Sequence, residues 1–541
     1  MISFFTNLSK IEKGIIIIIM MIYLHNLFLD VMNIDAAQYA AISSEMASTI
    51  SFLEVKDFGA DYLDKPPLLF WLSGISITLF GATNFAYKLP SFLFLMFSLY
   101  AVYRFTLLHY SERTAKNALL ILASTQAYFL ITNDVKTDGI LTSCVIISVW
   151  LFSEYFEKRK LKNLIFGSVF IGLAMLAKGP IGAIAVLMPL GINLMYQQKW
   201  GDVFNLRWFL VLIIVGLLLL PMTYGLYMQF DSHPEKGKSG LYFYYWLQSF
   251  GRITGENSWN NGSPWHFFLG SSVWDFFPWI FPFYIALFFK LKNVLHSKTK
   301  VPEITTLVGF IAIFAMMSLS KYKLPHYIFV TFPFASVILA KYLTDLDFKM
   351  WKRWSITYYV LGILILFLFI IFNLFFFSEF TFWGEFCIIL QLFILFYFKK
   401  SKAKSVGELL ILVLTLNLFL SFVFYPKLLC FQADANAAKW TSTKLKNEEV
   451  FLLNKSSHLF NFYTQNPFTK VISKNEIKKI NKPIWLYLSE EDLNQIKDLN
   501  LTITHKKVFI DYPISRLKLK FLLEIKRTSI LENKYLIKIQ N

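Results

Sequence analysis

The 541-residue chain has few charged residues for its length. Only 16% of its positions are Asp, Glu, Lys or Arg, whereas soluble domains carry about a quarter. Hydrophobic residues make up 56% of the chain, and aromatic residues alone make up 18%. This composition excludes an ordinary soluble domain and predicts a protein of the lipid bilayer.

The net charge of +18 does not indicate a nucleic-acid partner. The cations lie in short loops between apolar runs, and no basic helix is interleaved with aromatic residues as in a groove binder. Membrane topology explains this distribution better, because Lys and Arg gather in the cytoplasmic loops of membrane proteins.

Cysteine is also scarce. The three cysteines, Cys144, Cys387 and Cys430, are far apart in the sequence and show neither metal-ligand spacing nor a disulfide framework. An apolar run begins at Ile15, but no small-residue cleavage signal follows it. We therefore expect a retained first membrane span rather than a removed signal peptide. No internal repeat is visible in the chain.

Thirteen apolar stretches approach the length of about 17 to 25 residues that crosses the hydrocarbon core. They are 13–30, 88–109, 116–133, 136–156, 163–178, 180–197, 208–229, 267–289, 302–319, 326–344, 355–377, 382–398 and 406–425. With the N-terminus placed inside, Lys and Arg gather in the inner loops. The outer loops 31–87 and 229–266 are longer and poorer in lysine. The pattern predicts a cytoplasmic N-terminus and an outer C-terminal part.

Residues 426–541 change in character. Short alternating or apolar segments are separated by connectors rich in Lys, Asn and Glu, which predicts a small α/β domain. The segments are Val450–Leu453, Ile484–Leu488, Val508–Ile510 and Tyr535–Ile539. The predicted fold is a polytopic α-helical membrane domain, 1–425, followed by a small α/β domain outside the membrane, 426–541.

A minority of charged residues lies on the predicted outer face, where topology does not explain them. Ionisable groups at the bilayer boundary are costly and usually functional. Cations with a few carboxylates at such a boundary suit a phosphate-bearing lipid and a reaction on it. The residues are Asp35, Asp61, Asp64, Lys65, Asp134, Lys136, Asp138, Lys178, Arg252, Lys321 and Lys323.

Asp35 follows the first predicted span, and the sequence has a helical pattern from Ala36. Asp is a preferred N-cap residue, so Asp35 could cap this helix. Its carboxylate could also face a cavity, where it would orient or deprotonate a nucleophile. The two interpretations are compatible.

Lys65 lies in the segment "DYLDKPPLLFW" and has two interpretations. Its stem could follow Leu68 and Trp71 while the ammonium reaches the lipid headgroups. Alternatively, Pro66 keeps Lys65 out of the helical conformation and starts a new helix. An ammonium at the positive end of a helix is a natural phosphate site.

Three other segments also have a purely structural interpretation beside the functional one. "SLSKYKLPHY", 318–327, could anchor a span at the interface, "LAKGPIG", 176–182, could be a simple hairpin, and "NDVKTDG", 133–139, could be a tight turn. The histidines show no pair at helical spacing, so the sequence does not predict a metal site.

Taken together, these segments resemble the GT-C membrane glycosyltransferases of the group that holds protein O-mannosyltransferases and lipid A aminoarabinose transferases. "DAAQYA", "DYLDKPPLLFWL", "FGATNFAYKLPS", "LAKGP" and "SLSKYKLPHYIFVTFP" occur in the order found in that group, across roughly residues 30–335. Thirteen spans with an outer C-terminal domain also fit the aminoarabinose transferase type.

The resemblance implies an inverting transfer of a sugar from a polyprenyl (undecaprenyl) phosphate carrier to an acceptor, on the outer side of the bacterial inner membrane. Lipid A or another envelope glycolipid is the expected acceptor, and a Ser/Thr side chain is the alternative. No cofactor is expected to be required. A lipid-linked sugar transporter is a second alternative, although it should show charges near the middle of spans and inverted repeats. A non-catalytic lipid-binding scaffold is a third.

The resemblance also implies roles for individual residues. Asp35 matches the catalytic acid of the first outer loop, and Asp138 matches a catalytic acidic residue at the start of a later span. The donor phosphate would be bound by Lys65, Tyr62, Asp64 and Tyr327. Arg252, Lys321 and Lys323 are added to this set from their position on the predicted outer face. Further site candidates are Gln38, Tyr39, Asp134, Lys178 and His326.

The chain departs from the pattern of the group at two positions. Ala36 stands where the group often has Glu, and Gln38 stands where aminoarabinose transferases tend to carry Arg. The sequence therefore leaves the sugar unassigned.

Overall fold

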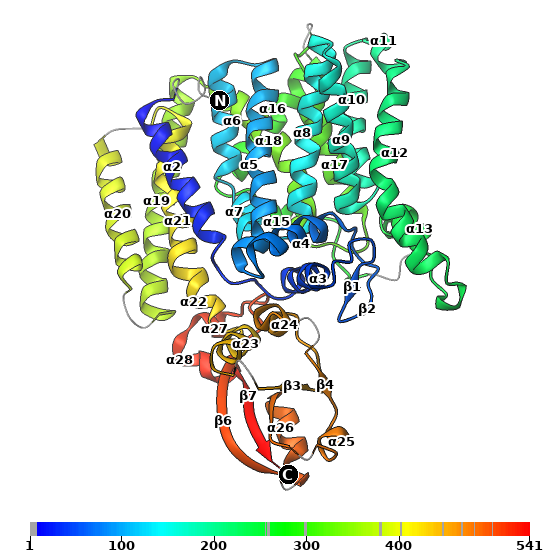
Figure 1. Ribbon diagram of the computed structural model, residues 1–541. Coiled ribbons are helices and arrows are strands. Elements are labelled where there is room, and N and C mark those ends of the chain that lie inside the picture. The colour runs from blue at the N-terminus through cyan, green and yellow to red at the C-terminus, as the bar shows by residue number, and fades with distance from the viewer. Residues whose placement is uncertain are drawn as a thin grey trace.

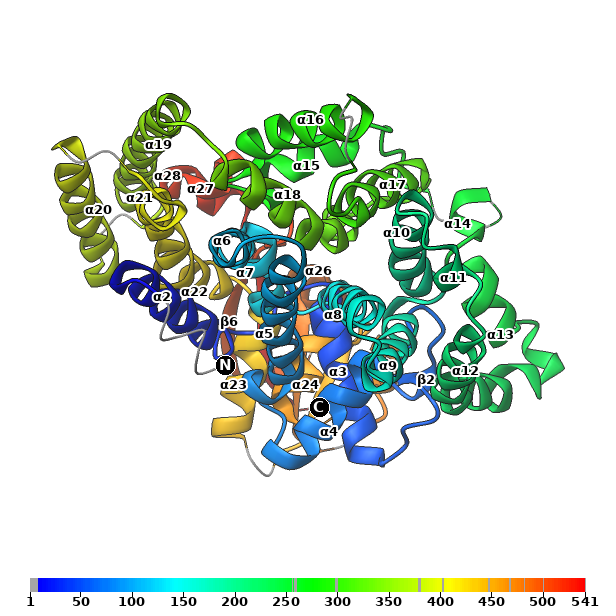
Figure 2. The same cartoon turned by 90° about the horizontal axis from the view of Figure 1, so that it is seen from above.

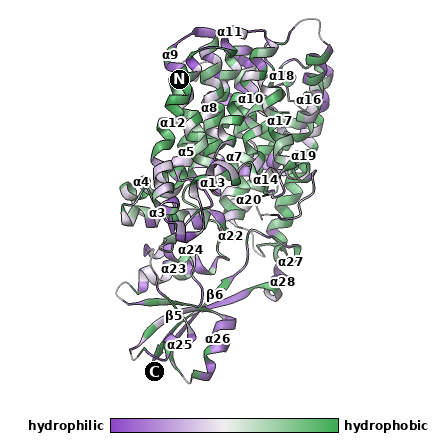
Figure 3. Ribbon diagram, turned by 90° about the vertical axis from the view of Figure 1, so that its right-hand side faces the viewer, coloured by the Kyte–Doolittle hydropathy of each residue, from purple (hydrophilic) through white to green (hydrophobic). Residues whose placement is uncertain are grey.

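The computed structural model describes residues 8–254, 256, 260–296, 300–377, 381–400, 403–445, 448–466, 469–480, 482–499 and 501–540. A bundle of long helices carries a smaller α/β domain at one end (Figure 1). The first turns of α2 lie at the opposite end of the bundle from this domain (Figure 1). Hydrophobic residues dominate the middle of the bundle, and polar residues dominate the α/β domain (Figure 3).

Within the described residues, eight helical segments are long and apolar enough to cross a membrane. A ninth is present if the pair α15 (Phe267–Asp275) and α16 (Ile280–His296), bent by 118°, forms one span. The eight are α5 (Asn84–His109), α8 (Thr137–Lys158), α9 (Leu161–Lys178), α11 (Trp200–Val203) with α12 (Arg207–Leu226) and η1 (Tyr227–Asp231), η4 (Pro325–Thr331) with α18 (Phe332–Thr344), α19 (Phe348–Phe375), α20 (Phe382–Lys400), and α21 (Val406–Phe419) with η5 (Leu420–Phe424) and α22 (Tyr425–Leu429).

The four remaining predicted spans are helical but shorter than eighteen residues. They fold as α2 (Lys10–Asn26), as α6 (Glu112–Ala123) with α7 (Gln126–Asn133), as α10 (Ile181–Tyr196), and as α17 (Thr305–Leu319). The stretch 116–133 is broken because Thr125 caps α7, its hydroxyl accepting from the Tyr128 N–H. A hydroxyl that satisfies the first turn of a helix in this way starts a new helix.

The helices are arranged in two groups when viewed from above (Figure 2). Helices α2, α19, α20 and α21 lie on one side, and α10, α12 and α17 lie on the other (Figures 1 and 2). Helices α5 and α8 lie between them (Figure 2).

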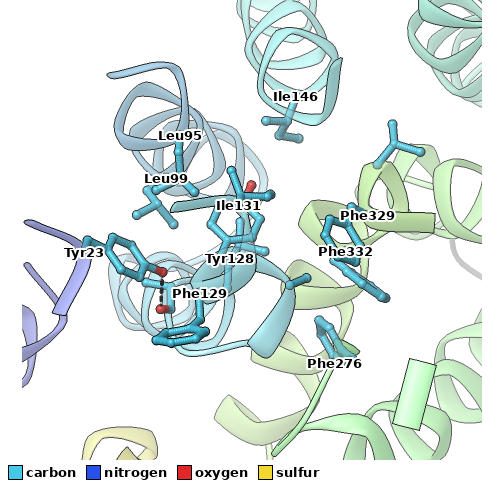
Figure 4. Close-up of a cluster of buried hydrophobic side chains, with 14 of the residues drawn as sticks. Tyr23, Leu95, Leu99, Tyr128, Phe129, Ile131, Ile146, Phe276, Phe329 and Phe332 are labelled. Carbon is cyan, nitrogen blue, oxygen red and sulfur yellow. Dashed lines mark hydrogen bonds between the residues drawn. The ribbon is translucent and has the colours of Figure 1, made fainter. Parts of the chain in front are cut away.

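Helix α7 is packed into the middle of the bundle by a cluster of buried aromatic and aliphatic side chains (Figure 4). Tyr128 and Phe129 of α7 lie between Tyr23 of α2 and Phe329 of η4 in this cluster (Figure 4). The Tyr23 hydroxyl donates a 2.5 Å hydrogen bond to the Ala123 carbonyl, so the buried phenol is satisfied. Because α7 ends at Asn133, this packing also positions the turn that carries Asp134.

The first predicted outer loop, 31–87, is largely structured. It holds α3 (Asp35–Thr49), a hairpin of β1 (Lys56–Asp57) and β2 (Ala60–Asp61), and α4 (Leu68–Phe80). Helix α4 begins directly after Pro66 and Pro67, as the two prolines predicted. Helices α3 and α4 lie at the end of the bundle nearest the α/β domain (Figure 1).

The second predicted outer loop, 229–266, follows η1 as a series of short helical turns. These are η2 (Pro234–Lys236), α13 (Gly240–Tyr242), η3 (Phe243–Leu247) and α14 (Gly251–Thr254).

The C-terminal part forms a five-stranded mixed sheet in the order β4-β3-β5-β7-β6. Strand β3 is parallel to β4 and β5, and β7 is antiparallel to β5 and β6. The elements are α23 (Ala433–Lys444), β3 (Val450–Leu453), α24 (His458–Thr464), β4 (Val471–Ile472), α25 (Lys474–Ile477), β5 (Ile484–Ser489), α26 (Glu490–Ile496), η6 (Lys497–Leu499), β6 (Thr502–Asp511), α27 (Leu519–Leu522), α28 (Glu524–Arg527), η7 (Thr528–Ile530) and β7 (Glu532–Gln540). The four segments predicted as strands fall within β3, β5, β6 and β7.

Candidate active site

Asp35 is the first residue of α3, and its carboxylate faces a cation from another helix. One carboxylate oxygen lies 3.8 Å from the Lys136 Nζ, and Lys136 also pairs with Asp134 at 3.0 Å. Burial alone would lower the pKa of Lys136, but the carboxylates of Asp134 and Asp35 outweigh it and raise this pKa. Lys136 therefore stays charged between two carboxylates.

The predicted capping role of Asp35 is wrong. The N-cap of α3 is Ile34, and no side-chain hydrogen bond caps this helix within the described residues. A carboxylate in the first turn still interacts favourably with the helix dipole. The Asp35 side chain is 36% exposed, so its free edge is accessible to a second molecule.

Asp138 is the centre of a second group. It is the second residue of α8 and forms an ion pair with Lys178, the last residue of α9. The His326 Nε2 lies 3.6 Å from its other oxygen. The Lys178 Nζ lies 3.8 Å from the centroid of the Tyr327 ring, which is cation–π geometry. Asp138 thus holds two cationic or polar side chains from two other helices.

The termination of α9 explains the position of Lys178. Gly179 follows with a φ of +87°, a conformation that glycine adopts without strain, and Pro180 cannot continue the helix. Lys178 is therefore presented at a helix C-terminus, where the dipole favours a cation.

Lys65 belongs to a third group, on the segment that joins β2 to α4. Its Nζ pairs with Asp64 at 2.9 Å, and the Tyr62 hydroxyl lies 3.5 Å from the same carboxylate. The Gln248 side-chain amide donates to the Asp64 carbonyl and ties this segment to the second outer loop. The Lys65 side chain is only 13% exposed. This burial disfavours the interpretation in which its ammonium extends freely to the headgroups.

A cavity of about 60 Å³ joins the second and third groups. Lys65, Lys178, Gln248 and Tyr327 contribute its polar lining. Its apolar lining comes from α10, α17 and the second outer loop, and consists of Ile181, Ile184, Phe250, Met316 and Met317. A smaller cavity lies on the other side of Lys65, against Pro67 and Phe243. Lys65 lines both.

Tyr39 lies near the carboxylates of the three groups. It is buried in α3, and its ring packs edge-on against Phe70 of α4. Burial raises the pKa of the Tyr39 hydroxyl well above its usual value, and nearby Tyr62 and the charges of Asp35, Asp64 and Asp138 raise it further. The hydroxyl therefore stays protonated beside carboxylates from all three groups.

Two of the predicted phosphate-binding residues, Lys321 and Lys323, are not among those that line the cavities at Lys65 within the described residues. Lys321 is exposed, and the Lys323 Nζ donates to the Ser263 carbonyl at 3.1 Å. Lys323 instead contacts Asn261 and Ser263 of the second outer loop. The side chain of Arg252 lies outside the described residues.

Sequence reasoning missed two partners of the site. Gln248 carried no signal, because a lone amide in an aromatic loop has no pattern to identify it. Asp57, which accepts a 2.8 Å hydrogen bond from Gln38, lies in the first outer loop but not at a predicted span end. Among the described residues, no three His, Cys, Asp or Glu side chains are grouped so as to hold a metal ion.

Residues 64–224 match the family described as dolichyl-phosphate-mannose-protein mannosyltransferase. This segment starts at Asp64 and includes Lys65, Asp138 and Lys178.

Curated relatives align over a larger part of the chain. The undecaprenyl phosphate-alpha-4-amino-4-deoxy-L-arabinose arabinosyl transferase of Wigglesworthia glossinidia brevipalpis is 27% identical over 363 residues, which is 64% of this chain and 61% of that protein. The corresponding transferase of Yersinia enterocolitica is 26% identical, over 59% of this chain and 56% of that protein. The chain thus covers less than two thirds of these relatives' length.

The fold matches a solved structure over nearly its whole length. ArnT from Cupriavidus metallidurans bound to undecaprenyl phosphate superposes with a TM-score of 0.73, at 16% identity, covering 97% of both chains. Its apo state superposes with a TM-score of 0.70.

The fold and the site therefore define a multi-span membrane protein with the GT-C fold of membrane glycosyltransferases. Within that class, these matches confirm the resemblance to the group of protein O-mannosyltransferases and lipid A aminoarabinose transferases.

Proposed function

We propose that this protein is an inverting glycosyltransferase that moves a sugar from a polyprenyl phosphate carrier to an acceptor at the outer side of the bacterial inner membrane. The observation that carries the proposal is the cavity lined by Lys65, Lys178 and Tyr327. Undecaprenyl phosphate is the carrier that the named relatives use, and we propose it as the donor lipid here.

The cavity has the two kinds of surface that such a donor requires. Its cations can bind a phosphate, and Met316, Met317 and Ile184 provide an apolar wall for the isoprenoid chain. Before binding, Lys65 is paired with Asp64 and Lys178 with Asp138. The phosphate would join these pairs as an additional acceptor, so both lysines are held in place beforehand.

The reaction follows from the charges. An acceptor oxygen attacks the anomeric carbon from the face opposite the phosphate, and the bond from that carbon to the phosphate oxygen breaks. Its electron pair goes to the phosphate, so negative charge develops there as the bond lengthens. Cations that bind this charge more tightly in the transition state lower the barrier.

In this proposal Asp35 acts on the acceptor. Its carboxylate is partly exposed and oriented by Lys136. With a hydroxyl acceptor, Asp35 takes the acceptor's proton as general base. With an acceptor phosphate that is already ionised, no base is needed and Asp35 only orients it. The catalytic role of Asp138 stays a prediction, and its contacts give it the further task of holding Lys178 and His326.

We propose lipid A or another envelope glycolipid as the acceptor, as the resemblance to lipid A aminoarabinose transferases implies. The family match at residues 64–224 favours a second candidate, a Ser or Thr side chain of a protein. We also propose that the α/β domain lies on the outer side. Helix α11 and the lysine-rich junction of α8 and α9 lie at the other end of the bundle, which suits the cytoplasmic face (Figure 1).

The test uses purified full-length protein in lipid nanodiscs with undecaprenyl phosphate carrying different sugars. Lipid A and a Ser/Thr-rich peptide are supplied as separate acceptors. Transfer to either acceptor that is lost in Lys65→Ala would support the proposal, and transfer to the peptide hydroxyl should also be lost in Asp35→Asn. Transfer that is unaffected by both changes would overturn the site. Movement of the donor across sealed vesicles without any transfer would favour a transporter instead.

A further inference from the structure

We propose that His458 of the α/β domain is a positioning residue for the active site, acting through Asp57 on the hairpin and on α3. The expected effect on activity rests on the proposed function, whereas the contact between His458 and Asp57 does not depend on it. His458 is the first residue of α24, and it contacts the first outer loop across about 400 positions of sequence.

The contact between His458 and Asp57 is bifurcated, with one ring nitrogen facing two oxygens. The His458 Nε2 lies 3.0 and 3.1 Å from the two carboxylate oxygens of Asp57. Because an ionised carboxylate only accepts hydrogen bonds, Nε2 is the nitrogen that carries the proton. The imidazole also lies against the Phe58 ring, with 4.6 Å between ring centroids. His458 and Asp57 are only 27% and 17% exposed, so this contact is partly shielded from water.

Asp57 also contacts α3, through Gln38. Its carboxylate accepts a 2.8 Å hydrogen bond from the Gln38 side chain. Gln38 lies three residues after Asp35 on the same helix, which places the two about one turn apart. The rotation of this first turn determines where the Asp35 carboxylate is presented.

The same hairpin leads to Lys65. The Gly59 N–H donates to Glu45 of α3, and the Tyr62 N–H donates to the Val55 carbonyl across the hairpin. Tyr62, Asp64 and Lys65 follow within a few residues. Displacement of the hairpin would therefore move the lysine that lines both cavities.

The α/β domain holds His458 in turn. Ser457 caps α24 and donates to Asp434 at 2.6 Å. Asp434 also accepts from Tyr487 at 2.8 Å and pairs with Lys534 at 2.6 Å. This network fixes the start of α24, so His458 is a rigid part of the domain rather than a mobile surface side chain.

The same domain also contacts the chain just before Asp35. The Gln432 side chain accepts from the Asn33 N–H at 2.8 Å and donates to the Val31 carbonyl at 3.0 Å. The Tyr463 hydroxyl accepts from the Val31 N–H at 2.8 Å. These contacts dock the domain without His458, so removing the imidazole should leave it in place.

The experiment compares His458→Ala, His458→Gln and the control His505→Ala in full-length protein. His505 is an exposed histidine of β6 in the same domain. We expect kcat/KM for undecaprenyl-phosphate sugar to fall about tenfold in His458→Ala, which is typical of losing a hydrogen bond to a charged group. Glutamine carries an N–H donor at a similar reach, so His458→Gln should recover most of the rate. The control should equal the wild type.

Hydrogen exchange provides a readout that does not need turnover. In His458→Ala, the amides of Gly59 and Tyr62 should exchange several-fold faster, and glutamine should restore their protection. If the wild type transfers no sugar, the proposed function fails and the exchange rates alone decide on His458. Unchanged exchange together with an unchanged rate in His458→Ala would overturn the inference. An equal loss in the alanine and glutamine variants would also overturn it, because a purely structural role would then explain the result.

Discussion

Replacing Lys65 with methionine tests the donor-phosphate assignment most directly. The change removes the ammonium and keeps most of the unbranched stem, so packing against Pro67 and Phe243 is largely preserved. What is lost is one charge at the cavity that Lys65 shares with Lys178 and Tyr327.

Two magnitudes distinguish the functional loss from a structural one. The ion pair of Lys65 with Asp64, whose carboxylate side chain is 31% exposed, is a partly solvated contact. Such pairs contribute about 1 kcal/mol or less to stability, so the free energy of unfolding should change little. A charge-assisted contact to a leaving phosphate contributes about 3 kcal/mol in the transition state, or roughly 10²-fold in rate. The variant should therefore be folded but slow.

The assay measures sugar transfer from undecaprenyl phosphate in nanodiscs, together with thermal unfolding of the same samples. We expect kcat/KM to fall about 10²-fold in Lys65→Met while the melting temperature changes by only a few degrees. Undecaprenyl phosphate alone should also bind more weakly. A variant that keeps more than half of the wild-type kcat/KM would refute the assignment. So would a loss of rate that merely follows a loss of folded protein.

Three further predictions concern the other groups. Asp138→Asn should cost about 3 kcal/mol of stability, because it removes the negative charge from the buried ion pair with Lys178. Combining it with Lys178→Met should regain much of that stability, and equal melting temperatures for the wild type and the single variant would contradict this. Asp35→Asn should lower transfer to a hydroxyl acceptor by about 10²-fold or more, but transfer to a phosphate acceptor by less than about tenfold; equal losses with both acceptors would argue against a general base. Turnover should persist in EDTA, and a loss that added divalent cations reverse would show that the reaction needs a metal.

The sequence was sufficient for features that depend on local pattern. Apolar runs of the right length predicted the helices, because spanning segments must satisfy their backbone internally. The prolines after Lys65 predicted the start of α4. Charged residues near the predicted span ends do meet, as Lys178 and Asp138 do, and their joint role in a site stays a prediction. Two predictions about helix starts were wrong. The stretch 116–133 is broken at Thr125, which begins a new helix, and Asp35 does not cap α3.

Pairing within the site was decided only by the tertiary structure. Lys178 meets Asp138 because α8 and α9 pack against each other. Lys136, the N-cap residue of α8, lies near the first residue of α3 and so meets Asp35. Lys321 and Lys323 had the same local signals as Lys65, yet Lys321 is exposed and Lys323 contacts the second outer loop. His458 lies in a different domain and had no signal at all.

The physical reason is the range of the interactions. Hydropathy, helix starts and charge bias are set by neighbouring residues, so one sequence is enough to predict the helices of the bundle and to expect charged residues near their ends. Which cation faces which carboxylate depends on how distant helices pack, and that packing is the sum of many contacts that no single segment encodes. The sequence therefore determined where the charged residues lie along the chain, and the tertiary structure determined that Lys178 meets Asp138 and that Lys136 meets Asp35.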